Sequence, residues 1–182
     1  ICKLILNSPL PPKKKISINT PFHVKIPYNL SRLGHVGTSY QVTQWFPKPA
    51  VYDTEGWHAM PYLDQGEFYS EFGNFNVSIT VPQNYIVAAT GNLQDENEKN
   101  WLLKRAEETA EIKDFKNLKT KYIKSDSITK TIRFTQNQVH DFAWFADKSF
   151  LILKSEIKLP NTGKKVDTWS YFTPYLANVW KN

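Results

Sequence analysis

Apolar and polar residues alternate with a period of two along much of this chain, and that pattern limits the folds open to it. From residue 74 to 81 the sequence NFNVSITV places large apolar side chains at odd positions and polar ones at even positions. Successive side chains of a β-strand point to opposite faces of a sheet, so this spacing predicts a half-buried strand. Comparable runs predict further strands at 22–28, 38–46, 85–91, 129–136, 149–159 and 165–172. We therefore expect a mainly β protein of antiparallel sheets, as in a β-sandwich.

One segment departs from this period and predicts a helical insert. Residues 96–112, ENEKNWLLKRAEETAEI, are rich in helix-forming side chains. Their larger side chains recur at the spacing of a helix face: Trp101, Leu102, Arg105 and Ala106.

Both ends of the chain carry patterns that stop short. Near the C-terminal end, Thr173 can cap a helix and Pro174 fits its first turn. The apolar residues that follow share one face: Leu176, Val179 and Trp180. At the other end, the alternation over residues 3–6 predicts a strand, and the sequence begins without methionine. We therefore expect a piece of a longer protein.

Composition indicates one large globular domain, because 41% of the 182 residues are hydrophobic and 14% are aromatic. The single cysteine, Cys2, excludes an internal disulfide, and no apolar run approaches the roughly 20 residues of a membrane-spanning helix. The net charge of +6 reflects lysines gathered at 13–15 and 113–124. Nucleic-acid surfaces favour arginine together with aromatic residues, so we interpret these lysines as a solvated basic face.

Motifs for metal and cofactor binding are absent from the sequence. It contains no His-Glu-x-x-His, no Gly-x-Ser-x-Gly, no phosphate-binding loop and no dinucleotide fingerprint. Its four histidines are not spaced as ligand pairs: His23, His35, His58 and His140. The sequence therefore predicts that this chain holds neither a zinc ion nor a cofactor.

Five carboxylates between residues 43 and 75 raise the question of acid–base catalysis: Asp53, Glu55, Asp64, Glu67 and Glu71. Two of them across a cleft, such as Asp64 and Glu67, would suit a glycosidase. We favour the alternative, in which Asp53 and Asp64 fix turns through their side-chain oxygens while Glu67 and Glu71 lie at strand edges. His58, beside Trp57, fits a hydrogen-bonded packing residue better than a metal ligand.

Three segments resemble a known family: YQVTQWFPKPAVYD at 40–53, GWHAMPYLDQGEFYSEFGNFNVSITVPQNYIVAATGNL at 56–93, and QVHDFAWFADKSF at 138–150. In this order they resemble the N-terminal domain of zinc aminopeptidases of the aminopeptidase N family. The similarity is greatest to its Bacteroidetes-like bacterial branch. It is dense from Ser31 to Leu93 and resumes at Gln138.

The resemblance implies a saddle-like N-terminal β domain over residues 1–172, with its first strands missing, and the start of a linker to a catalytic domain at 173–182. In that family the zinc site belongs to the catalytic domain. The chain would then be a non-catalytic part of a metallopeptidase, with the catalytic domain of the same polypeptide as its partner. Zinc, a peptide substrate and export to the periplasm or cell envelope are implied for the parent. The alternative is a stand-alone β-sandwich module that binds carbohydrate or protein through exposed aromatic residues.

Two residues are implied to face the substrate of the parent. The family has a Thr-Gln-x-Glu segment whose Gln and Glu point at the substrate's first residue and free amine. Here Gln44 occupies the Gln position, and Phe46 occupies the Glu position. A phenyl ring cannot replace a carboxylate that pairs with an ammonium group. Residues two apart on a strand share a face, so a strand here would direct both side chains into one cleft.

Overall fold

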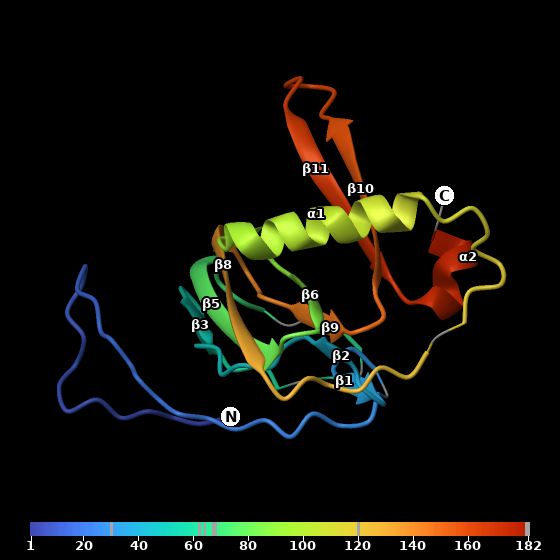
Figure 1. Ribbon diagram of the computed structural model, residues 1–182. Helices are drawn as coiled ribbons and strands as arrows, with labels where there is room; N and C mark the ends of the chain where they lie inside the picture. Colours follow the sequence, from blue (N-terminus) through green and yellow to red (C-terminus); the bar gives the residue numbers. More distant parts are fainter. Residues whose placement is uncertain (30, 62, 64, 67–68, 120, 181–182) are drawn as a thin grey trace.

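The computed structural model describes residues 1–29, 31–61, 63, 65–66, 69–119 and 121–180. Within these ranges the chain is mainly β, and its strands pair in antiparallel sheets (Figure 1). The predicted fold class is therefore confirmed. No helix in the described part of the chain combines the length and the apolar character needed to cross a membrane.

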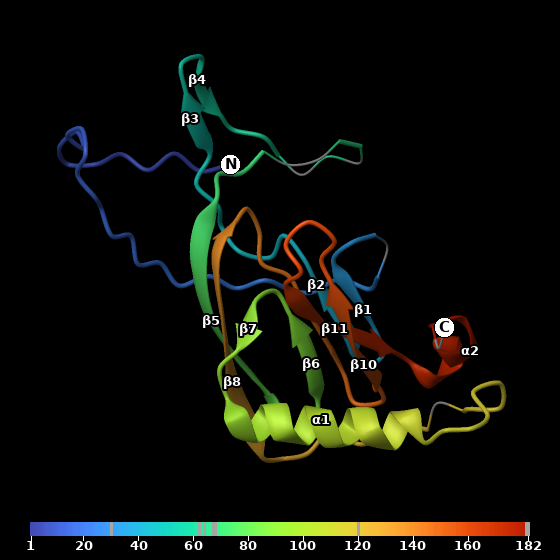
Figure 2. The ribbon, with the colours of Figure 1, turned by 90° about the horizontal axis from the view of Figure 1, so that it is seen from above.

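The largest sheet contains, in spatial order, β1 (Gly34–Val36), β2 (Ser39–Val42), β9 (Trp144–Asp147) and β6 (Ile86–Ala89). A second sheet contains β5 (Gly73–Pro82), β8 (Thr129–Val139) and β7 (Asn92–Leu93). Two hairpins complete the described strands: β3 (Val51–Asp53) with β4 (Gly56–His58), and β10 (Leu151–Lys158) with β11 (Lys165–Phe172). Figure 2 shows the β3–β4 hairpin standing away from the body of the molecule.

The alternating strand β5 forms the first core with β8, its antiparallel partner along almost its whole length. Apolar side chains of the two strands join others from β6, β9 and the loops before them in one buried cluster: Ile79, Val81, Tyr85, Val87, Ile132, Phe134, Phe142 and Ala146. The polar side chains of β5 remain on the exposed face, as the period of two predicts.

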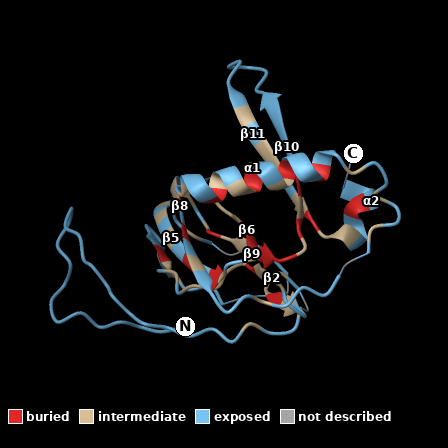
Figure 3. Ribbon diagram, viewed as in Figure 1, coloured by how far each residue is buried: buried red, intermediate tan, exposed pale blue. Residues whose placement is uncertain are grey.

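The helix α1 (Glu96–Ala110) lies across the sheets and builds a second core (Figure 3). It begins after Asp95, whose side chain accepts a hydrogen bond of 2.8 Å from the backbone N–H of Glu98. This cap satisfies one of the free N–H groups of the first turn. The buried face of the helix packs on β10 and β6 in one cluster: Ile86, Leu102, Ala106, Phe150 and Ile152.

Several expected boundaries are wrong. Residues 3–6 and 22–28 form no strand, apart from a single parallel bridge between Tyr28 and His35. The strand expected over 38–46 begins at Ser39 and ends at Val42. The expected C-terminal helix is present as a 3-10 turn η1 (Pro174–Leu176) followed by α2 (Ala177–Trp180), although Thr173 makes no side-chain capping bond.

Candidate functional site

The loop after β2 carries Gln44 and Phe46, and it is not a strand. Gln44 has a φ of 52°, which lies in the left-handed region and turns the backbone out of the sheet. The two side chains therefore do not share a strand face, so that part of the expectation is wrong. Both are half-buried.

Phe46 lies in an aromatic cluster against the first core. Its ring packs edge-on against Trp45 and Phe75, with ring centroids 5.3 Å and 5.6 Å away. The indole N–H of Trp45 donates a hydrogen bond of 3.0 Å to the carbonyl oxygen of Phe142. These contacts attach the loop to the segment before β9, and they give Phe46 a packing role.

A lysine covers the Phe46 ring. The Lys48 Nζ lies 5.2 Å from the ring centroid and 2.8 Å from Oδ1 of Asp141. Both charged side chains are largely buried, with 19% and 17% of their surface exposed. A carboxylate at position 46 would therefore meet the Lys48 ammonium before any ligand.

The β3–β4 hairpin presents two exposed aromatic rings. Tyr52 and Trp57 are cross-strand partners, their centroids are 4.9 Å apart, and their planes are inclined by 54°. Their side chains are 65% and 71% exposed, although large aromatic side chains usually bury most of their surface. Val51, at the base of the hairpin, is buried and anchors it to the body.

Asp53 fixes the turn of this hairpin, as predicted. Its Oδ1 accepts hydrogen bonds from the backbone N–H of Glu55 at 2.9 Å and from the His58 ring at 2.7 Å. The hydrogen bond from His58, followed by that from Glu55, lowers the pKa of Asp53 below its usual value. His58 also packs edge-on against Tyr69, with centroids 5.4 Å apart, so it acts as a hydrogen-bonded packing residue.

The structure does not test the hypothesis that two carboxylates of this segment form an acid–base pair. Asp64 and Glu67 lie outside the described residues, and Glu71 is exposed. Among the residues that the structure describes, no three His, Cys, Asp or Glu side chains gather in a group that could hold a metal ion. That observation is compatible with a chain that binds no zinc.

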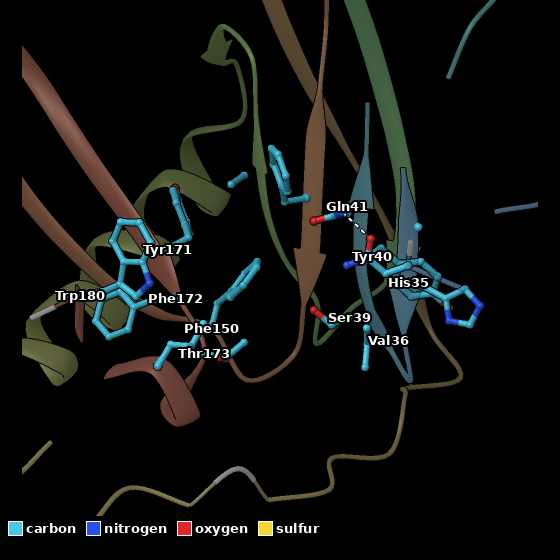
Figure 4. Close-up of a pocket in the computed structure, with 15 residues that line it drawn as sticks. His35, Val36, Ser39, Tyr40, Gln41, Phe150, Tyr171, Phe172, Thr173 and Trp180 are labelled. Carbon is cyan, nitrogen blue, oxygen red and sulfur yellow. Dashed lines mark hydrogen bonds between the residues drawn. The ribbon is translucent and has the colours of Figure 1, made fainter. Parts of the chain in front are cut away.

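A groove that the sequence did not predict lies between the largest sheet and the C-terminal segment (Figure 4). Its volume is about 490 Å³. One wall comes from β1, β2 and β9; the other comes from Phe150, the end of β11, and the turn and helix after it. The predicted apolar face of the C-terminal helix is the one signal that pointed here, because Leu176 and Trp180 line the groove.

Comparison of the chain with protein-family models, with curated protein sequences and with solved structures found no match. The family resemblance of residues 31–93 therefore stays a prediction.

Proposed function

We propose that this chain is the non-catalytic N-terminal β domain of a zinc metallopeptidase that resembles aminopeptidase N, and that its β3–β4 hairpin packs against the catalytic domain of the same polypeptide. In this proposal the zinc, the peptide substrate and the catalytic groups belong to the parent protein. The domain walls the substrate cleft, with Gln44 facing it and Phe46 fixing the loop. Export to the periplasm or cell envelope is part of the same proposal.

One observation supports this docking role above the others. The segment that carries the family resemblance also carries exposed aromatic side chains along its length: Tyr52, Trp57, Tyr69 and Phe72. Exposed apolar side chains that gather on a surface often mark a site that binds another protein or domain. The Asp53–His58 pair belongs to the same hairpin, and the His58 ring packs against Tyr69.

The coding sequence beyond Asn182 provides the first test. We expect it to encode a His-Glu-x-x-His helix with a second glutamate downstream, which are the ligands of a catalytic zinc. The full-length protein should then hydrolyse aminoacyl amides and lose that activity with a chelator. The 182-residue chain alone should hydrolyse neither these nor common glycosides. Chelator-sensitive turnover by the chain alone would contradict the proposal.

A carbohydrate-binding module is the second candidate, and the same hairpin favours it. The two exposed rings can stack on a sugar, and the Asp53 carboxylate beside them can accept hydrogen bonds from its hydroxyl groups. A glycan array separates the candidates, because specific binding that disappears in Trp57→Ala would favour the module. If no glycan binds and a zinc motif lies downstream, the peptidase domain is favoured.

A further inference from the structure

We propose that the groove of Figure 4 binds an uncharged aromatic ring that carries an amide group, as a free small molecule or as an aromatic residue of a peptide. This site is separate from the β3–β4 hairpin, and it does not depend on the proposed peptidase function.

The walls of the groove suit a flat apolar body. Phe150 and Phe172 are buried in one wall, whereas Phe145 of the sheet and Trp180 after β11 are 38% and 55% exposed and offer ring surface to a ligand. Aromatic rings at such a site favour offset or edge-to-face contact with another ring. The volume of about 490 Å³ lies in the range of roughly 300–1,000 Å³ that small-ligand sites occupy.

The row of side chains across the sheet explains why the groove is open. Gln41 of β2 is paired with Gly34 on one side and with Phe145 on the other, and Phe145 is paired with Ala88 of β6. Directly paired residues project to the same face of a sheet. One large ring and one amide therefore stand between two small residues, which leaves space on both sides.

Gly34 also brings the second polar group to the site. A Cβ atom on Gly34 would lie 2.5 Å from the Cα atom of Asn29, so only glycine allows this approach. Asn29 consequently reaches Gln41, whose Nε2 donates hydrogen bonds of 2.7 Å to Asn29 Oδ1 and 2.6 Å to the carbonyl oxygen of Ser31.

That pair of amides leaves a matched donor and acceptor for a ligand. The two hydrogens of Gln41 Nε2 are used within the chain, so its carbonyl oxygen can accept, while the Asn29 amide nitrogen can donate. An amide group on the ligand offers the complementary N–H and C=O.

Charge selects against ionised ligands. None of the described residues that line the groove is Asp, Glu, Lys or Arg. A charged ligand would lose its hydration without gaining an ionic partner, which is unfavourable. The chemistry of the walls thus points to a neutral ligand.

Binding can be measured by NMR titration of the isotope-labelled chain with three probes of one ring system. N-acetyl-tryptophanamide carries the ring and the amide, 3-methylindole carries only the ring, and tryptophan carries both charges of a free amino acid. We expect saturable binding of N-acetyl-tryptophanamide, weaker binding of 3-methylindole and none of tryptophan. A blocked pentapeptide with a central tryptophan tells the two sources apart, because only a peptide ligand should gain affinity from the added residues.

Two variants test the assigned contacts. Trp180→Ala, at an exposed position, should weaken both ring ligands about tenfold. Gln41→Leu should weaken N-acetyl-tryptophanamide about fivefold to tenfold and leave 3-methylindole unchanged. Tyr122→Ala removes an exposed aromatic ring that does not line the groove and should change nothing. Thermal melting checks that each variant is folded.

The proposal would be overturned by any of three results. These are no saturable binding of N-acetyl-tryptophanamide, equal binding of tryptophan and its blocked amide, and equal effects of Trp180→Ala and Tyr122→Ala. If Gln41→Leu fails to fold, the Trp180 comparison and the ranking of the three probes still decide the matter.

Discussion

Lys130→Met should destabilise the fold, because it removes the cationic partner of Glu98, a carboxylate on the buried face of α1. The Lys130 Nζ lies 2.6 Å from Oε1 of Glu98, and their side chains are only 15% and 9% exposed. The same ammonium lies 4.1 Å from the ring centroid of Trp101. Methionine keeps an unbranched stem against that ring but leaves the Glu98 charge without an ion pair.

The magnitude follows from burial and from pH. Breaking a buried ion pair on one side costs about 3–5 kcal/mol, and residual exposure places this pair at the lower end, about 3 kcal/mol at neutral pH. Burial raises the pKa of Glu98 above its usual value, although the hydrogen bond from Lys130 opposes that shift. Without Lys130 the pKa should rise further.

The sign of the pH dependence follows from that raised pKa. As the pH rises above about 4.5, Glu98 of the unfolded chain loses its proton before Glu98 of the folded chain. Stability therefore falls through this window, and it falls more steeply in the variant. The destabilisation by Lys130→Met should shrink when the pH is lowered toward 4.5.

Urea unfolding followed by tryptophan fluorescence measures the free energy of unfolding at neutral pH and near pH 4.5. The proteins compared are the wild type, Lys130→Met, Glu98→Gln and the double variant. The double variant should recover most of the loss at neutral pH, with a coupling energy above about 1 kcal/mol. If Lys130→Met lowers the free energy of unfolding by less than about 0.5 kcal/mol at neutral pH, or by an amount that does not depend on pH, Lys130 does not stabilise the Glu98 carboxylate as proposed.

Other predictions concern the backbone, the loop after β2 and metal binding. Gly91→Ala should destabilise by about 2–4 kcal/mol, since φ is 92° and the added Cβ would lie 2.6 Å from a carbonyl oxygen of β8. Gly37→Ala, also at positive φ but in open space, should lose about 1 kcal/mol in the same thermal melts. In the full-length parent, Gln44→Ala should lower kcat/KM about 10- to 100-fold without lowering Tm, and an equal loss of folded protein would assign it to packing. Phe46→Glu should raise the preference for a free over an N-acetylated peptide only when Lys48→Met removes the neighbouring ammonium; an equal rise without it would contradict this contact. Calorimetric titration of the chain with zinc should show no stoichiometric site tighter than micromolar, and finding one would contradict the prediction that this chain binds no zinc.

The alternation of apolar and polar residues predicted a strand correctly where a long neighbouring strand paired with it and buried one of its faces. The pattern in β5 could be interpreted correctly because β8 covers it from Gly73 to Pro82. The same pattern over residues 22–28 failed, since Tyr28 alone forms a bridge there. A pattern describes which side chains could be buried, and it does not supply the neighbouring strand that buries them.

The candidate sites were less predictable, for two physical reasons. The turn at Gln44 depends on a positive φ, and glutamine does not predict it because glycine and asparagine are the residues that usually adopt that conformation. The groove depends on registers between strands far apart in sequence, such as the pairing of Gln41 with Phe145. By contrast, the role of Asp53 was predictable, because aspartate commonly accepts the backbone N–H two residues later in a turn.

Hydroxyl-radical footprinting of the full-length protein tests the central proposal most directly. If the β3–β4 hairpin packs against a catalytic domain, Tyr52 and Trp57 should be oxidised severalfold more slowly in the full-length protein than in the 182-residue chain. Tyr122, which is 87% exposed in another loop, provides the matched control and should react equally in both. Equal oxidation of Tyr52 and Trp57 in the two proteins would contradict the account.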